Sequence, residues 1–302
     1  MKKKTVRRIA AFAVSSVMGA AALAMFAGCT TLHPEITITY NFDGKDYEVN
    51  YVLSRNDAPQ TVQHFLELAN AGFYDGMVVH DFKSNAIHTG GYYYDAQQAN
   101  NGGLVEVNYL EKVKALESEK KTTFTQSVWA DAAREVPLYT VYGEFTANGV
   151  TNAKRENSLS KGALVMYYTE KENASGEVPD VYAKRADGGS KNDGDPYSKS
   201  AYKYNSATSL FYTCTGSGGD DASDYCVFGK AKNYSGQMEK GLLAAINKYT
   251  ETLEAEDEFT EAIQYRLNQY DYFRPVREGD VKAEFKFPRD MRITIRVKVN
   301  KY

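Results

Sequence analysis

The sequence has few of the residues that bind metal ions. Its 302 residues include 3 cysteines and 4 histidines. The histidines stand singly at His33, His64, His80 and His88, without the paired cysteine or carboxylate spacing of a metal site. We therefore expect neither a metal ion nor a cofactor.

An excess of positive charge is also missing. Lys and Arg number 36 against 39 Asp and Glu. Residues 1–28 hold five of the basic residues and no acidic ones, so the rest of the chain carries 31 − 39 = −8. Because nucleic-acid phosphates require a basic surface, we expect no nucleic-acid partner.

Positive charge gathers at the N-terminus, as in a secretory signal peptide. Basic residues within positions 2–8 precede an uncharged run over 9–26, which is long enough to approach a membrane span. Phe26-Ala-Gly-Cys29 resembles the bacterial lipobox, where small residues precede a cysteine that is acylated. We expect a signal peptide over 1–28, lipid on Cys29, a tether over 29–34 and an extracytoplasmic protein anchored to a bacterial membrane. An uncleaved transmembrane anchor is the alternative.

Two further cysteines, Cys214 and Cys226, are twelve positions apart. Export permits a disulfide between them, but this spacing alone does not indicate one. Two small, buried, unpaired side chains are the favoured interpretation, and pairing stays open as the alternative.

Apolar and alternating runs predict a mainly β protein. The expected strands cover 36–40, 47–53, 73–80, 86–91, 142–145, 162–166, 209–215, 225–230 and 292–299. A helix is expected from Asp57, as its cap, through Pro59 in the first turn to Gly72 at its end. Two more helices are expected over 238–249 and 255–270. The polar stretch 167–205 is not expected to form a core strand.

Several short motifs follow one another in a fixed order. Ala58-Pro-Gln-Thr-Val-Gln-His-Phe65 and Gly72-Phe-Tyr-Asp-Gly76 precede His80, which stands ten residues before Gly90-Gly91. The later motifs are Tyr142-Gly-Glu-Phe145, Gly162-Ala-Leu-Val-Met166, residues 205–215 and Val227-Phe-Gly-Lys230. This series resembles the cyclophilin family of peptidyl-prolyl cis-trans isomerases.

The resemblance implies one closed antiparallel cyclophilin-like β-barrel over residues 35–302, capped by helices. The family pattern leaves about 92–141 and 167–204 as insertions and about 238–290 as an extra helical segment. It also implies isomerisation of X–Pro bonds in exported polypeptides as the activity.

The residues that the family uses in its active site differ here. The catalytic arginine is expected directly after His80, where this chain has Asp81. A carboxylate accepts hydrogen bonds and cannot donate one to a twisting amide. Other changes, such as alanine for the pocket phenylalanine, affect the proline pocket and groove at Ala86, Ile87, Thr89, Tyr167, Tyr168, Leu210, Tyr212, Asp220 and Tyr225. The sequence therefore predicts weak or absent isomerase activity.

The sequence leaves alternatives open for the role of Asp81 and for the function of the protein. An ordinary solvated turn carboxylate is favoured over a new catalytic role for Asp81. A replacement cation is the other option, from Arg134, Arg155 or Arg185. The protein is then either an active foldase for exported proteins or a module that binds polypeptides through its tyrosine-rich segments without turning them over.

The anchor is expected to depend on one thiol. Cys29→Ser should leave the chain uncleaved or release it from the membrane fraction, because the acyl chain has no other attachment. Cell fractionation with N-terminal sequencing measures both results. Unchanged membrane association with an intact N-terminus would instead identify residues 9–26 as a transmembrane helix.

Overall fold

The computed structural model describes residues 31–97, 103–120, 122–145, 148–150, 156–167, 180–184, 197–216, 226–254, 258–266, 282–288 and 291–302. Leu32–Lys301 is one compact unit, and of the other unit only Thr31 and Tyr302 are described. The predicted signal peptide and Cys29 lie outside the described residues. Within the described part of the chain, no helix has the length and apolar character needed to cross a bilayer.

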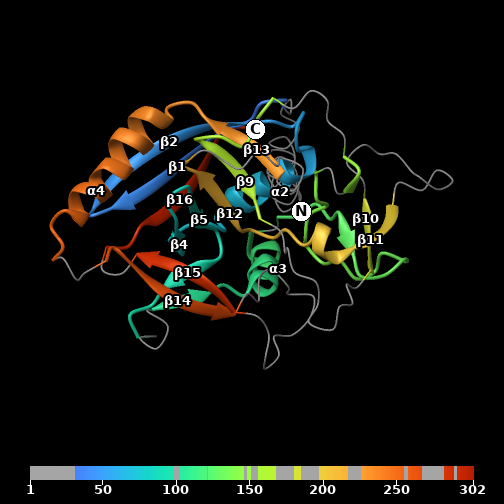
Figure 1. The fold of residues 1–302 in the computed structure, drawn as a ribbon. Coiled ribbons are helices and arrows are strands. Elements are labelled where there is room, and N and C mark those ends of the chain that lie inside the picture. The colour runs from blue at the N-terminus through green and yellow to red at the C-terminus, as the bar shows by residue number, and fades with distance from the viewer. Residues whose placement is uncertain are drawn as a thin grey trace, which may run out of the picture. The chain divides into compact units, whose positions relative to one another are not determined.

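Nine strands form the main sheet (Figure 1). All neighbouring pairs are antiparallel, which confirms the mainly β fold class. In sheet order the strands are β3 (Met77–Val78), β16 (Thr294–Lys301), β1 (Glu35–Phe42), β2 (Lys45–Leu53), β13 (Cys226–Ala231), β9 (Ala163–Met166), β12 (Phe211–Cys214), β5 (Ala86–Thr89) and β4 (Asp81–Phe82).

The end strands of this sheet, β3 and β4, are consecutive in the chain and separated by Val79 and His80. No ladder joins these two described strands, so the expected barrel closure is not seen. Single hydrogen bonds hold the linking residues instead: Val79 N–H donates to Ile293 O (2.8 Å) and His80 N–H to His88 O (3.1 Å). The C-terminal strand β16 pairs with β1 and β3, as expected for a chain whose last strand belongs to the main sheet.

Helix α2 (Pro59–Asn70) supplies the apolar face predicted for the first helix. Pro59 opens it, and Gly72 follows its end with the positive φ of 75° that favours glycine. From this helix Phe65 packs against the rings of Tyr74, Phe211 and Phe228 at 5.0–5.2 Å between centroids. This aromatic cluster joins α2 to β12 and β13 and forms part of the core.

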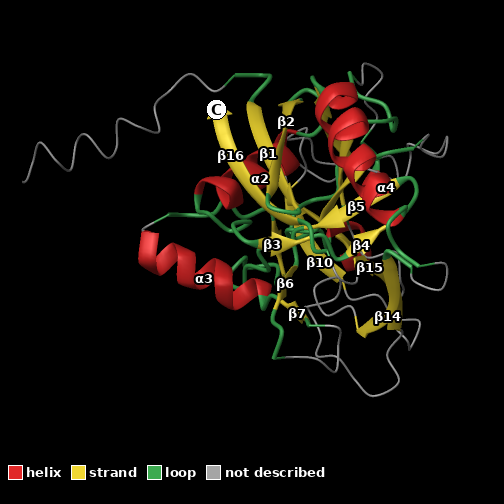
Figure 2. Ribbon diagram, turned by 90° about the vertical axis from the view of Figure 1, so that its left-hand side faces the viewer, coloured by secondary structure: helices red, strands yellow, loops and turns green. Residues whose placement is uncertain are grey.

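The remaining elements include three smaller sheets and several helices (Figure 2). The sheets are β11 (Tyr197–Ala201) with β10 (Asp180–Lys184) and β8 (Val128–Trp129), β14 (Thr260–Arg266) with β15 (Lys282–Pro288), and β6 (Tyr92–Tyr94) with β7 (Leu104–Glu106). The helices are α3 (Tyr109–Lys120), the 3-10 turn η3 (Tyr202–Asn205), and the π-helix η5 (Tyr234–Leu243), which continues into α4 (Ala244–Thr250).

The helix expected over 255–270 is wrong, and so is a helical segment extending to 290. Strand β14 occupies 260–266 and pairs with β15, where Ile263 stands opposite Phe285. The charged sequence favours a helix locally, but the ladder to a strand further along the chain overrides that preference. Of the two helices expected after residue 237, the one over 238–249 is confirmed, as η5 and α4.

Two other expectations also fail, the strand expected over 142–145 and the absence of a core strand in 167–205. In both segments backbone N–H groups find partners in residues far away in the sequence. Residues 142–145 form no strand: Tyr142 N–H donates to Ser127 Oγ (3.1 Å) and Gly143 N–H to Asn205 Oδ1 (3.3 Å). Within the polar stretch 167–205, β10 buries Val181 and Ala183 in a satellite cluster with Val128. The stretch therefore contributes two strands, β10 and β11, to a three-stranded sheet with β8.

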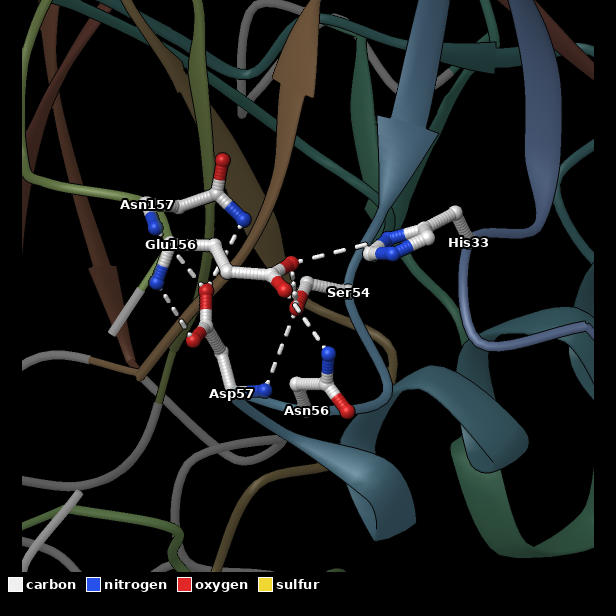
Figure 3. A network of polar contacts seen from close by, with 6 residues as sticks. All are labelled: His33, Ser54, Asn56, Asp57, Glu156 and Asn157. Atoms are coloured by element: carbon white, nitrogen blue, oxygen red, sulfur yellow. Dashed lines mark hydrogen bonds and ion pairs between the residues drawn. The ribbon is translucent and has the colours of Figure 1, made fainter. Parts of the chain in front are cut away.

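Asp57 does not cap α2, although it is buried beside the helix start (Figure 3). Its carboxylate accepts hydrogen bonds from Glu156 N–H (2.8 Å), Asn157 N–H (2.9 Å) and Asn157 Nδ2 (2.9 Å). The N–H groups of Gln60 and Thr61 instead reach the carboxylate of Glu144 at 3.0 and 2.9 Å. Asp57 thus ties a distant loop to the helix start, and Glu144 satisfies the helix donors.

Replacing Asp57 should destabilise the fold more than replacing its exposed neighbour. Asp57→Ala leaves two backbone donors without an acceptor, and we expect it to lower the free energy of unfolding by about 2–3 kcal/mol. The control Asn56→Ala removes one exposed bond to Glu156 and should cost less than about 1 kcal/mol. Urea unfolding measures both; equal losses would contradict this role for Asp57.

Candidate functional site

Asp81 is the residue that the sequence predicts to stand in place of the family's catalytic arginine. It opens β4, stands opposite His88 of β5, and is 2% exposed. Its carboxylate forms an ion pair with Lys83 Nζ (2.8 Å) and accepts a hydrogen bond from the backbone N–H of Lys286 (2.9 Å). The interpretation of Asp81 as a solvated turn carboxylate is therefore wrong. It is a buried, partnered group in a strand.

The partner Lys286 comes from β15, which lies beside β4 (Figure 1, Figure 2). Phe285 and Phe287 flank it in the strand and are 4% and 0% exposed. They belong to one apolar cluster with Val78, Tyr92, Leu104 and Leu210. The hairpin β14–β15 thus covers the region that begins at Asp81 and reaches Leu210.

His80 lies directly under this cover. Its ring centroid is 4.5 Å from that of Tyr92 and 5.0 Å from that of Phe285. The side chain is 0% exposed, and neither ring nitrogen has a hydrogen-bond partner among the described residues. Burial lowers the pKa of His80 well below 6.5, and His88 and Lys83 nearby lower it further, so the ring is neutral.

The predicted groove positions within the described residues are buried, but Ile87 and Thr89 of β5 face away from Ala86. Ala86, Ile87, Thr89, Leu210 and Tyr212 are all buried. Ala86 and Tyr212 form a second cluster, with Ala163, Val165, Cys214 and Val227. Tyr167 packs against both clusters and connects them. Tyr168, Asp220 and Tyr225 lie outside the described residues.

His88, which the sequence analysis did not place in the groove, lies between its tyrosines. Its ring stacks on Tyr212 with centroids 4.9 Å apart and meets Tyr167 edge-on at 5.4 Å. Burial lowers the pKa of His88 to about 3. The strand pairing explains the contact, because β5 places His88 directly opposite Tyr212 of β12.

No replacement cation is found among the described candidates. Arg134 is exposed in the turn after β8, where its N–H donates to Asp131 O (3.1 Å). Arg155 and Arg185 lie outside the described residues. The cation that does reach Asp81 is Lys83, which the sequence analysis missed although it is two residues away.

The described residues contain no group of side chains suited to hold a metal ion. Cys214 and Cys226 are both buried and are not joined by a disulfide, which confirms the favoured interpretation of these cysteines. A serine, a glutamate and a histidine do meet at Ser54, Glu156 and His33 (Figure 3). There the glutamate is the middle member, whereas a hydrolytic triad needs the histidine beside the serine.

A pair of matched substitutions tests the environment of His80. We expect His80→Phe to keep or raise stability at pH 7, because it removes two buried nitrogens without partners, each costing about 1–3 kcal/mol. It should also reduce the loss of stability on acidification below 6.5, since wild-type His80 binds a proton more readily in the unfolded chain. The control His64→Phe should destabilise, because His64 Nε2 is bonded to Thr208 O (2.9 Å).

Denaturant unfolding across pH measures these effects. Similar destabilisation by both substitutions would contradict the assignment of His80 as a histidine without polar partners.

The chain is similar to known proteins of one family. The profile of the family "Cyclophilin type peptidyl-prolyl cis-trans isomerase/CLD" matches residues 37–263. A cyclophilin-type isomerase structure from Cryptosporidium parvum is 13% identical, with 89% of this chain and 99% of that chain covered and a TM-score of 0.40. The Mimivirus cyclophilin is 13% identical, with 90% and 91% covered and a TM-score of 0.42. A search of curated proteins finds no match. Because the profile spans most of the sequence, the chain belongs to the cyclophilin-type peptidyl-prolyl cis-trans isomerase family.

Proposed function

We propose that this protein is a membrane-anchored, extracytoplasmic cyclophilin-family protein with weak or no isomerase activity, whose domain binds polypeptide. The observation that carries the proposal is the state of Asp81. An acidic side chain, already bonded to Lys83 and to the backbone of β15, stands where the family pattern has an arginine.

Isomerisation of an X–Pro bond requires rotation about an amide whose barrier is about 18–20 kcal/mol. In the family a guanidinium lowers this barrier by donating to the twisted amide and by stabilising the charge that develops there. The Asp81 carboxylate has no proton to donate and repels negative charge. Its two partners also occupy both carboxylate oxygens.

The pocket for proline is altered as well. The family's phenylalanine is Ala86, and this residue packs in a cluster with the larger ring of Tyr212. Tyr167 fills the space between the two apolar clusters. These buried contacts support a binding surface whose shape differs from that of the family.

An active foldase for exported proteins is the second candidate, and family membership favours it. It requires a cation at the amide from a residue outside the described part of the chain, such as Arg155 or Arg185. A polypeptide-binding module requires no such group, and the groove tyrosines provide large contact areas at low entropic cost.

The remaining parts of the proposal follow from the sequence. Lipid on Cys29 holds the domain 35–302 at the membrane through the tether 29–34, with 92–141 and 167–204 as insertions in the family pattern. Lipidation contributes about 0.8 kcal/mol per buried methylene, so the anchor needs no basic patch. The net charge of −8 beyond residue 28 argues against nucleic acid as a partner.

A peptide assay of X–Pro isomerisation tests the proposal, with an active cyclophilin as the positive control. The chain from residue 30 should show little or no acceleration, because loss of one preorganised donor typically costs about 2.7–4 kcal/mol, or two to three orders of magnitude in rate. Asp81→Arg should recover little, since the pocket is altered too. Asp81→Asn is the matched control for loss of the charge alone.

Robust turnover by the wild-type chain would contradict the proposal. Loss of that turnover in Arg155→Ala or Arg185→Ala would then identify the replacement cation.

A further inference from the structure

The hairpin β14–β15 contacts the main sheet through side chains and not through a strand ladder among the described residues. Its two strands form a separate sheet, and no ladder joins them to β4 among the described residues. The backbone N–H of Lys286 donates a hydrogen bond to the side chain of Asp81 (2.9 Å). Apolar contacts add to the docking.

Strand β15 presents a regular pattern to this surface. Phe285 and Phe287 point to one face and are buried, whereas Glu284 on the other face is exposed. Lys286, between the two aromatic residues, leaves its side chain 45% exposed. The surface therefore receives an extended strand through two aromatic side chains at alternate positions and one main-chain donor.

The receiving surface matches that pattern. Asp81 accepts the main-chain N–H, and Lys83 balances its charge. His80 and Tyr92 contact the ring of Phe285, and Leu210 belongs to the cluster that holds Phe287. A main-chain bond combined with pockets for alternate side chains is a general mode of strand recognition.

Docking of the hairpin also buries polar atoms that would regain water if the hairpin left. With Phe285 in place, both ring nitrogens of His80 are buried without partners. Water would reach these atoms if β15 left, which opposes the apolar gain of docking. Since an isolated two-stranded hairpin is marginally stable in water, this strand is suited to exchange with another of the same pattern.

We propose that the surface formed by His80, Asp81, Tyr92 and Leu210 binds extended polypeptides with aromatic side chains at alternate positions, and that β15 is its intramolecular occupant. The partner is an extended Phe-x-Phe segment of an exported polypeptide, which displaces β15. The inference deepens the proposed function by naming what the domain binds. It concerns binding, whereas the proposed loss of activity concerns catalysis.

The test uses a fluorescent peptide with the sequence of residues 282–288, Lys-Ala-Glu-Phe-Lys-Phe-Pro. The protein is the chain from residue 30, which contains the whole compact unit Leu32–Lys301. Phe285→Ala/Phe287→Ala, which weakens the internal strand, should bind the peptide at least tenfold more tightly than wild type in fluorescence anisotropy. Adding Asp81→Ala to that variant should weaken binding several-fold.

Two control peptides define the specificity. A peptide with both phenylalanines replaced by alanine should not bind, and a peptide ending in alanine instead of proline should bind as well as the parent. Equal binding of all three peptides would overturn the proposal. So would binding that requires proline, because it would indicate an ordinary X–Pro site.

Hydrogen exchange of the wild-type chain provides a second measurement if the double variant fails to fold. Excess peptide should speed amide exchange in β15, including Lys286, and leave β1 and β2 unchanged. Unchanged exchange in β15 at saturating peptide would overturn the proposal. Isomerase assays of the same samples are a separate readout: turnover would contradict the proposed lack of activity and leave the binding result intact.

Discussion

The burial of one carboxylate governs the arrangement of the site. A buried charge is tolerated only when it is paired and hydrogen-bonded. Asp81 meets this requirement with Lys83, two residues along the chain, and with the backbone N–H of Lys286 from β15. The second bond places Phe285 and Phe287 on either side of the contact point, over His80 and Leu210. The burial of Asp81 and the packing of β15 over His80 and Leu210 are therefore parts of one arrangement.

The two faces of the main sheet carry different groups of aromatic side chains. On the core side of the sheet, Phe65, Phe211 and Phe228 pack as a scaffold requires, and their motifs are those by which the family resemblance is seen. On the groove side, His88 and Tyr212 stack on each other and Tyr167 closes over them. These buried side chains therefore pack against one another on this face of the sheet.

Sequence reasoning succeeded where local pattern and tertiary structure agree. The hairpin of β1 and β2 turns at Asp43 and Gly44, which have positive φ values of 52° and 71° and form a recognisable turn pair. It failed where a residue far away in the sequence determines the local structure or burial. The charged segment around Ile263 is a strand because Phe285 lies opposite it, and Asp81 is buried because Lys286 comes from 205 positions further along the chain. The alternation Phe285-Lys-Phe287 was a usable strand signal, but nothing local relates it to Asp81.

The contact between Phe285 and His80 is the central claim, and NMR of the isotopically labelled chain tests it most directly. The account predicts nuclear Overhauser effects between the ring protons of these two residues, because their centroids are 5.0 Å apart. It also predicts that the Lys286 amide is protected from exchange in the wild type and exposed in Asp81→Ala. Absence of the ring contacts, with a Lys286 amide that exchanges at the same rate in both proteins, would contradict it.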